Sequence, residues 1–351
     1  MTSAYPKYVK LFFVLAILIM LCHSLYIAQD ILKPIAIALF FTFLLSPISR
    51  WLRKKRFSKW FAILLSIVLA IIVIIALFYF FVYQLYSFQE DLPELQKNLE
   101  GRIHDLQVYI AKNTSFSRRE QTAWFNDKLV LIGQDASTYI LNVFSSTGAF
   151  LADFFLIPIY VFFMTYYQER FILVIASISK AANQRKIKFI VAKVAMVSQQ
   201  YIKGMLIDII ILALLNSFGF MILGLEHAIL FGTLAAFLNI VPYIGVIVGS
   251  IFPILIALLT KDSIWYPIGV LGVCVFVQFL DNNFITPKVV GSSVSINPLA
   301  ATLVLIIGAA LWGVLGMILS IPVTGMIKVL LDNVNSLKPY GYLLGEEEKM
   351  K

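Results

Sequence analysis

An acid and three amides lie close together at the end of an apolar stretch, in the segment from Gln278 to Gly291. Its polar members include Gln278, Asp281, Asn282 and Asn283. An ionisable side chain at membrane depth costs roughly 2.5 to 3.5 kcal/mol on insertion scales, so it persists mainly where it faces water, a solute or a protein partner. The cluster therefore predicts either the lining of a polar pathway or a solvated helix end.

Pro287 and Gly291 follow the cluster directly. Both residue types interrupt helices, proline because it lacks an N–H group and glycine because of its backbone freedom. We therefore expect the apolar helix to end at the cluster, and we include both residues among the candidates for a pathway.

The composition is that of a polytopic membrane protein. Of 351 residues, 60% are hydrophobic and only 13% are charged, and the mean hydropathy is +0.89, whereas soluble domains carry about 25% charged residues. A helix needs roughly 20 apolar residues to cross a hydrocarbon core of about 30 Å. Stretches that approach or exceed this length are Leu11 to Ala28, Trp60 to Tyr86, Phe150 to Tyr167, Met205 to Leu223 and Ile264 to Leu280, and a shorter one is Ile35 to Ile48. The expected fold is all-α.

Basic residues predict the orientation in the membrane. The net charge is +9, and the basic residues gather at the ends of the predicted spans. They are Arg50, Arg53, Lys54, Lys55, Arg56 and Lys59, then Arg170, Lys180, Arg185, Lys186, Lys188, Lys193 and Lys203. The positive-inside rule places such groups in the cytoplasm, and the pattern favours contact with a lipid bilayer over a nucleic acid. Both termini are then expected in the cytoplasm.

This orientation divides the chain into successive parts. They are N-terminal transmembrane helices (1–86), extracytoplasmic amphipathic helices (87–147), a span (148–167), cytoplasmic interfacial helices (168–203), a core region with two interrupted segments (204–331) and a cytoplasmic tail (332–351). In the extracytoplasmic part, apolar residues recur at steps of three or four from Phe88 to Ile110, which indicates one helix stripe. Its expected partner is a second helix over roughly 121–144 or, alternatively, another copy of the chain in a homo-oligomer.

Two apolar stretches of the core region, 228–259 and 298–331, are interrupted near the middle. The interruptions contain Asn239, Pro242 and Gly245 in the first stretch, and Gly313 and Gly316 in the second. The helical legs would measure about 20 and 24 Å at 1.5 Å per residue, which is short for a crossing. Paired interruptions are typical of transporter binding sites, where helix ends and unwound backbone contact polar cargo. We expect two re-entrant hairpins that enter from opposite faces, with ordinary tilted spans as the alternative.

Asp208 is a second acid in an apolar setting, one turn past Gly204 and near the cytoplasmic start of its span. It either pairs with Lys203 or is solvated at the interface, or it takes part in binding a coupling ion. Asp208 and Asp281 are the candidates to bind and release a proton as access to the site alternates.

Several motifs in order make the chain resemble the autoinducer-2 exporter (AI-2E) family of predicted permeases. The motifs are Leu45-Ser-Pro-Ile, Tyr201-Ile-Lys-Gly, Asn239-Ile-Val-Pro-Tyr-Ile-Gly, the segment beginning at Asp281, Asn297-Pro-Leu and Leu311-Trp-Gly-Val-Leu-Gly-Met. They cover most of the chain. Where this chain has Asp281-Asn-Asn, many family members carry glutamate, glycine and asparagine.

The resemblance implies a secondary transporter of the bacterial inner membrane that exports a small polar solute such as autoinducer-2, driven by a proton or sodium gradient. A sodium or lithium/proton antiporter is the alternative, and a non-transporting membrane scaffold is a second one. The sequence contains no phosphate-binding Gly-Lys-Ser or Gly-Lys-Thr and no Gly-x-Ser-x-Gly, and its three histidines are far apart. We therefore expect no enzymatic activity, no cofactor and no metal site.

Overall fold

The computed structural model describes residues 6–113, 147–177, 184–242, 244–290 and 296–345, and these residues form helices joined by short turns, with no strand among them. The helices are α1 (Lys7–Ile27), α2 (Gln29–Lys54), α3 (Lys59–Asn113), α5 (Thr147–Ser177), α6 (Gln184–Ile222), α7 (Ala228–Leu238), α8 (Ile244–Thr260), α9 (Trp265–Leu280), the π-helix η2 (Asp281–Ile285), α10 (Thr286–Val289), α11 (Pro298–Asn333) and α12 (Lys338–Leu344). The predicted all-α class is confirmed.

Six helical segments of the described part are long and apolar enough to cross a membrane. They are Gln29–Lys54, Lys59–Asp91, Phe154–Ser177, Gln184–Ile222, Trp265–Val289 and Pro298–Asn333. Their outer faces carry many exposed apolar side chains, such as Phe78 at 70% and Phe155 at 66% exposure. Such surfaces are stable in lipid and not in water, so the chain is an integral multi-pass membrane protein.

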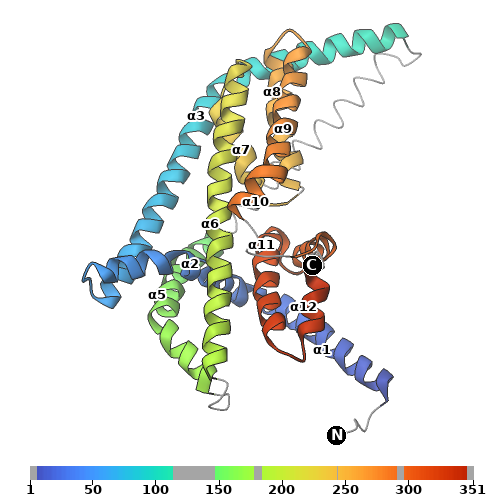
Figure 1. Cartoon of the computed structure of the whole chain (residues 1–351). Helices are drawn as coiled ribbons and strands as arrows, with labels where there is room; N and C mark the ends of the chain where they lie inside the picture. The colour runs from blue at the N-terminus through green and yellow to red at the C-terminus, as the bar shows by residue number, and fades with distance from the viewer. Residues whose placement is uncertain (1–5, 114–146, 178–183, 243, 291–295, 346–351) are drawn as a thin grey trace.

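Helix α6 connects two groups of helices (Figure 1). In the upper group of Figure 1, α7 and α9 pack on α6, and α8 packs on α7 and α9. Phe220, Leu230 and Val270 lie in the core of this group and are nearly inaccessible to solvent. In the lower group, α2 and α5 pack around Ala38 and Val161, and α11 lies against α6 and α12. With 39 residues, α6 measures about 58 Å at 1.5 Å per residue, so one helix reaches both groups.

Two long helices run through boundaries that the sequence predicts. Helix α6 is continuous past residue 203, and α3 is continuous past residue 86. Pro93 lies inside α3, and Figure 1 shows the helix changing direction where it passes α7 and α8. Proline removes a backbone hydrogen bond and bends a helix. Which residues of these helices lie inside the membrane stays a prediction.

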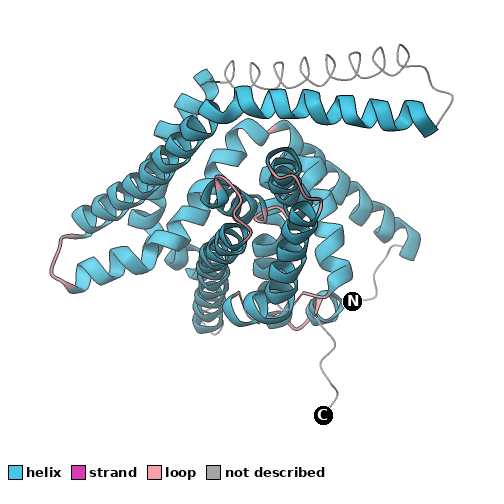
Figure 2. Ribbon diagram, turned by 90° about the horizontal axis from the view of Figure 1, so that it is seen from above, coloured by secondary structure: helices cyan, strands magenta, loops and turns pink. Residues whose placement is uncertain are grey.

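The outer part of α3 lies against the α7–α8 pair, and Figure 2 shows it running along one side of the molecule. Phe88 and Leu95 pack against the apolar cluster of α6 to α9. Nε2 of His227 lies 2.5 Å from Oδ2 of Asp91, within the distance of a hydrogen bond or an ion pair. The side chain of Arg102 donates a hydrogen bond to the carbonyl oxygen of Lys261 at 2.9 Å. The first part of the apolar stripe on α3 therefore packs against α7 and α8. The expected partner helix over 121–144 lies outside the described residues.

Both interruptions occur where the sequence predicts them. Helices α7 and α8 are separate, and the backbone of Gly245 lies so close to the carbonyl of Leu238 that no side chain fits between them. Within α11, Trp312 and Gly313 depart from helical angles, with Gly313 at a φ of 63° that favours glycine. Whether the two hairpins are re-entrant in the membrane stays a prediction.

The expectation that the helix ends at the acid cluster is wrong. Helix α9 continues through η2 into α10 as far as Val289. Pro287 lies at the beginning of α10, directly after the π-helix η2, and prolines and π-turns can distort a helix without ending it. Gly291 lies outside the described residues.

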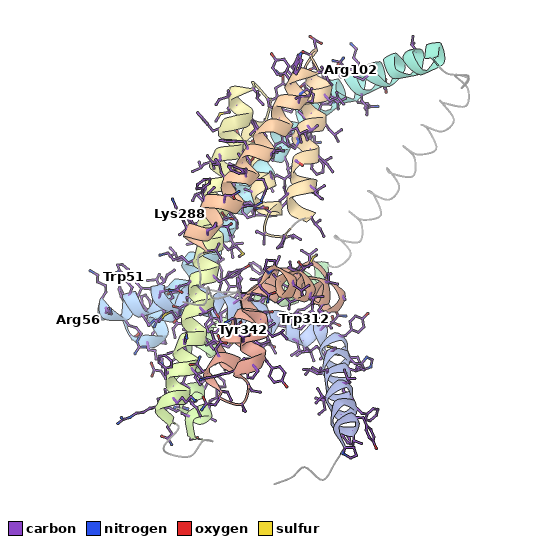
Figure 3. All side chains as sticks on the ribbon, turned by 45° about the vertical axis from the view of Figure 1, so that its right-hand side comes forward. Trp51, Arg56, Arg102, Lys288, Trp312 and Tyr342 are labelled. Carbon is purple, nitrogen blue, oxygen red and sulfur yellow. The ribbon has the colours of Figure 1, made fainter. Side chains whose placement is uncertain are left out.

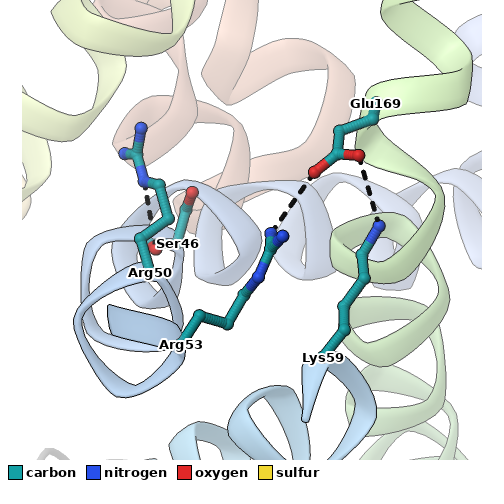
Figure 4. A network of polar contacts seen from close by, with 5 residues as sticks. All are labelled: Ser46, Arg50, Arg53, Lys59 and Glu169. Atoms are coloured by element: carbon teal, nitrogen blue, oxygen red, sulfur yellow. Dashed lines mark hydrogen bonds and ion pairs between the residues drawn. The ribbon is translucent and has the colours of Figure 1, made fainter. Parts of the chain in front are cut away.

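Basic residues join the ends of α2, α3 and α5 (Figure 4). Glu169 of α5 contacts Arg53 at 3.3 Å and Lys59 at 3.6 Å, and Arg50 donates to the carbonyl oxygen of Ser46 at 3.3 Å. These side chains are substantially exposed, so each ion pair contributes at most about 1 kcal/mol. The ion pairs therefore contribute little to the stability of the fold, and their main effect is to hold the ends of α2, α3 and α5 near one another.

Candidate solute and ion site

Asp281 is the centre of a buried polar cluster where α6, the α7–α8 turn and the π-helix meet. Its side chain is 3% exposed. Oδ2 accepts hydrogen bonds from the amides of Asn239 and Gln278, each at 3.2 Å, and Oδ1 accepts one from the hydroxyl of Thr286 at 2.7 Å. Hydrogen bonds to the charged form of a carboxylate stabilise it. The arrangement thus surrounds a carboxyl group with three hydrogen-bond donors inside a largely apolar group of helices.

Thr286 is a site residue that the sequence interpretation missed. It follows Asp281 by five positions, which on an α-helix is about 140° around the axis at 3.6 residues per turn. The π-helix spaces its hydrogen bonds from residue i to residue i+5, and this wider turn brings the Thr286 hydroxyl over Asp281. A proline after an acid cluster in an apolar segment was the only available signal for such a distortion.

Asp208 of α6 lies near enough to Asp281 for the charges of the two carboxyl groups to interact. Asp208 is 8% exposed, and its Oδ1 has no hydrogen-bond partner among the described residues. The close packing of α6 on α10 depends on Gly204, because a Cβ at this position would lie 2.6 Å from the carbonyl oxygen of Val289. A glycine one turn before Asp208 therefore lets α6 pack directly on the backbone of α10.

A small cavity lies beside Asn239 and Gln278, the two amides that donate to Asp281, but neither Asp208 nor Asp281 lines it. Its polar lining comes from Asn216, Asn239, Ser250 and Gln278, and its apolar lining includes Val277. The cavity has a volume of about 30 Å³, which is room for roughly two water molecules at 10 to 15 Å³ each. In this state the site accepts a water molecule or a small ion, and a larger solute requires the helices to separate.

The other predicted site residues are distributed around this centre. Asn282 accepts a hydrogen bond from Gln278 at 3.0 Å, whereas Asn283 donates to the carbonyl oxygen of Phe279 in its own helix at 2.8 Å. Pro242 lies in the turn that carries Asn239, and Gly245 lies in the first turn of α8.

Gly313 and Gly316 belong to the second interruption, in the lower group of helices. Gly316 contacts Gly308 of the opposite leg of α11, and the neighbouring Trp312 donates from Nε1 to the carbonyl oxygen of Leu25 in α1 at 3.0 Å. Figure 3 shows Trp312 beside α1, while Lys288, shortly after Asp281, lies on α10. The structure thus brings Asp208 and Asn239 to Asp281, and it ties the second interruption to α1.

The chemistry available at this site is that of two carboxyl groups, amides and hydroxyls. No lysine, arginine or histidine in the described ranges forms an ion pair with either aspartate. Groups of three or more histidine, cysteine or acidic side chains suited to a metal ion are also absent from that part of the chain. Such a site is suited to bind a proton, a small cation or the hydroxyl groups of a polar solute.

Comparison with known proteins agrees with the family resemblance in the sequence. The family model described as AI-2E family transporter matches residues 15–336. A putative transport protein of Haemophilus influenzae is 28% identical over 352 residues, covering 96% of each chain, and the Bacillus subtilis putative transport protein YrrI is 25% identical over 330 residues, covering 87% of each. The AI-2 transport protein TqsA of Escherichia coli is 22% identical over 352 residues, covering 97% of this chain and 96% of TqsA.

Proposed function

The chain belongs to the AI-2E family of membrane transporters, and we propose that it is a secondary transporter that exports a small polar solute such as autoinducer-2, driven by a proton or sodium gradient. The observation that carries this proposal is the bond from Asn239 to Asp281, because it connects an interrupted helix to a buried acid. Interrupted helices and intramembrane acids are the two features that most often form transporter sites.

The cargo is proposed from chemistry and from one relative. Autoinducer-2 is a small furanone rich in hydroxyl groups, which amides and carboxylates bind well. TqsA, which is similar along nearly its whole length, is named an AI-2 transport protein. Because the cavity of about 30 Å³ is too small for such a solute, binding requires the helices that line it to separate.

The orientation in the membrane is proposed from the basic residues. Basic residues at the ends of α2, α3 and α5 meet in one network, and the positive-inside rule favours placing this network in the cytoplasm. The protein is then a component of the bacterial inner membrane with both termini in the cytoplasm. Helix α3 reaches the opposite side beside the ends of α7 and α8.

Uptake of labelled autoinducer-2 into inside-out vesicles tests the proposal. Vesicles with the wild-type protein should accumulate the solute when energised, and a protonophore or a sodium ionophore should abolish accumulation, depending on the coupling ion. Accumulation equal to that of vesicles without the protein would reject this cargo, and accumulation that survives both ionophores would reject gradient coupling.

A pair of variants connects this assay to the site. Asp281→Asn removes the buried charge with little change in shape and should reduce accumulation to the background level. Asp30→Asn removes an exposed carboxylate from the first turn of α2 and should leave accumulation unchanged. Equal behaviour of the two variants at equal protein levels would show that Asp281 is not part of the pathway.

A further inference from the structure

Asp208 and Asp281 are both buried and face each other, but their hydrogen-bond surroundings differ. Asp281 accepts hydrogen bonds from Asn239, Gln278 and Thr286. By contrast, Oδ1 of Asp208 is buried and lacks a donor among the described residues. Donated hydrogen bonds stabilise an ionised carboxylate, and a buried carboxylate without them is costly. The surroundings therefore favour charge on Asp281 and neutrality on Asp208.

Protonation of Asp208 removes two energetic costs. These are the burial of a charged carboxylate that lacks donors and the repulsion between this charge and that of Asp281. Two ionised carboxylates at this separation would repel each other in a site from which water is largely excluded. A protonated carboxyl has one O–H donor, and the neighbouring carboxylate of Asp281 is an acceptor for it. We propose that Asp208 carries an exchangeable proton, whereas Asp281 stays ionised and binds the cargo or its counter-ion.

Charged and titratable groups near the pair are few. Tyr201, on the same helix, is close enough to interact with the charge of Asp208, and Cys274 of α9 lines the adjoining cavity. Lys203 of α6 and Lys288 of α10 are exposed. On other helices that pack on α6, Arg50 of α2 bonds to Gln199, Glu169 of α5 to Arg53, and Lys328 of α11 to Asp332. In the described part of the chain, Asp281 is thus the main charge that Asp208 faces.

Release of this proton changes the charge of the site by one unit. The O–H bond of Asp208 breaks, the proton passes to water, and the pair changes from one negative charge to two, with no redox step. This change in charge affects the α7–α8 turn through Asn239, because the side chain of Asn239 lies in that turn and donates a hydrogen bond to Asp281. The role of this proton in transport rests on the proposed function, but the assignment of protonation states does not.

Infrared difference spectroscopy of the purified full-length protein in lipid tests the assignment directly. At neutral pH the wild-type protein should show the C=O band of a protonated carboxylic acid, and isotopic labelling of aspartate side chains should shift it. The band should be lost in Asp208→Asn and retained in Asp30→Asn. Absence of the band in the wild type, or its loss in Asp281→Asn with retention in Asp208→Asn, would overturn the proposal. The labelling needs no variant, so it remains informative if a variant fails to fold.

Solute counterflow in proteoliposomes tests the transport role separately, with labelled autoinducer-2 as the probe. Asn at position 208 resembles a permanently protonated aspartate, so Asp208→Asn should lose the acceleration of exchange by a pH gradient, whereas Asp30→Asn should keep it. Retained acceleration would overturn the role of Asp208 as proton carrier. If the wild type exchanges no autoinducer-2, the proposed cargo fails, while the infrared result still decides the protonation assignment.

Discussion

Asn239, in the turn between α7 and α8, donates its side-chain amide to Oδ2 of Asp281 in the π-helix after α9, across 3.2 Å. This bond fixes the interrupted helix pair to the only π-helix in the described ranges. A hydrogen bond to a charged group contributes about 1.5 to 3 kcal/mol. Loss of this bond is therefore large enough to be measured as a change in transport rate.

The first prediction concerns this bond. Asn239→Ala should reduce the rate of gradient-driven solute accumulation by about tenfold or more, since loss of roughly 1.4 kcal/mol corresponds to a factor of ten. Asn283→Ala is the matched control, because the Asn283 amide bonds only to the carbonyl of Phe279 in its own helix. Initial uptake rates in inside-out vesicles measure both. Equal rates for the two variants would contradict a role for Asn239 in the pathway.

The second prediction concerns the approach of α6 to α10. A Cβ at Gly204 would lie 2.6 Å from Val289 O and 2.7 Å from Val290 Cα, whereas one at Gly272 meets nothing within 4 Å. Overpacking costs about 1 to 3 kcal/mol, so Gly204→Ala should lower the thermal unfolding temperature by several degrees. Gly272→Ala should leave it unchanged or raise it slightly, because alanine is the better helix former by about 1 kcal/mol. Thermal unfolding of both variants in the same detergent decides between these outcomes.

The third prediction concerns Asn297, which begins α11 and holds the end of α12. Its Oδ1 accepts from the backbone of Ala300 at 2.8 Å, and its amide donates to the carbonyls of Leu343 at 2.8 Å and Gly345 at 3.1 Å. Asn297→Ala should cost about 1 to 2 kcal/mol as a lost helix cap and should release the C-terminal segment to protease.

Asn297→Asp separates these two roles, because aspartate also caps helices but cannot donate to the carbonyls. We expect it to retain the thermal stability of the wild type and yet to show the faster proteolysis of the C-terminal segment. Proteolysis at the wild-type rate in both variants would show that the contacts with Leu343 and Gly345 do not hold α12 in place.

The fourth prediction concerns re-entrance of the two hairpins. In a protein whose Cys22 and Cys274 are replaced by alanine, a cysteine at Ile240 should not react with a membrane-impermeant thiol reagent from the cytoplasmic side. A cysteine at Trp312 should not react from the outer side. Reaction of either from that face would show that its hairpin crosses the whole membrane. Cysteine at the exposed Glu226 serves as the positive control for the outer side.

The sequence predicted more of the fold than of the site, and particular residues show why. Pro242 and Gly313 mark their interruptions because both act on the backbone of their own segment. Asp281 was identified because a charge in an apolar stretch is costly wherever the stretch packs. Thr286 was missed because its position depends on a π-helix, and Asp208 was left with three alternatives because its partner lies on another helix.

Hydrophobicity and backbone preference are properties of short segments, and they determined the all-helical membrane class, the positions of both interruptions and the candidate acid. The packing of helices against one another decided the rest. Gly204 lets α6 approach α10, and Asp208 thereby meets Asp281, while the contact of Trp312 with Leu25 places the second interruption beside α1. Such contacts depend on which surfaces fit together in three dimensions, and a pattern along one chain does not contain that information.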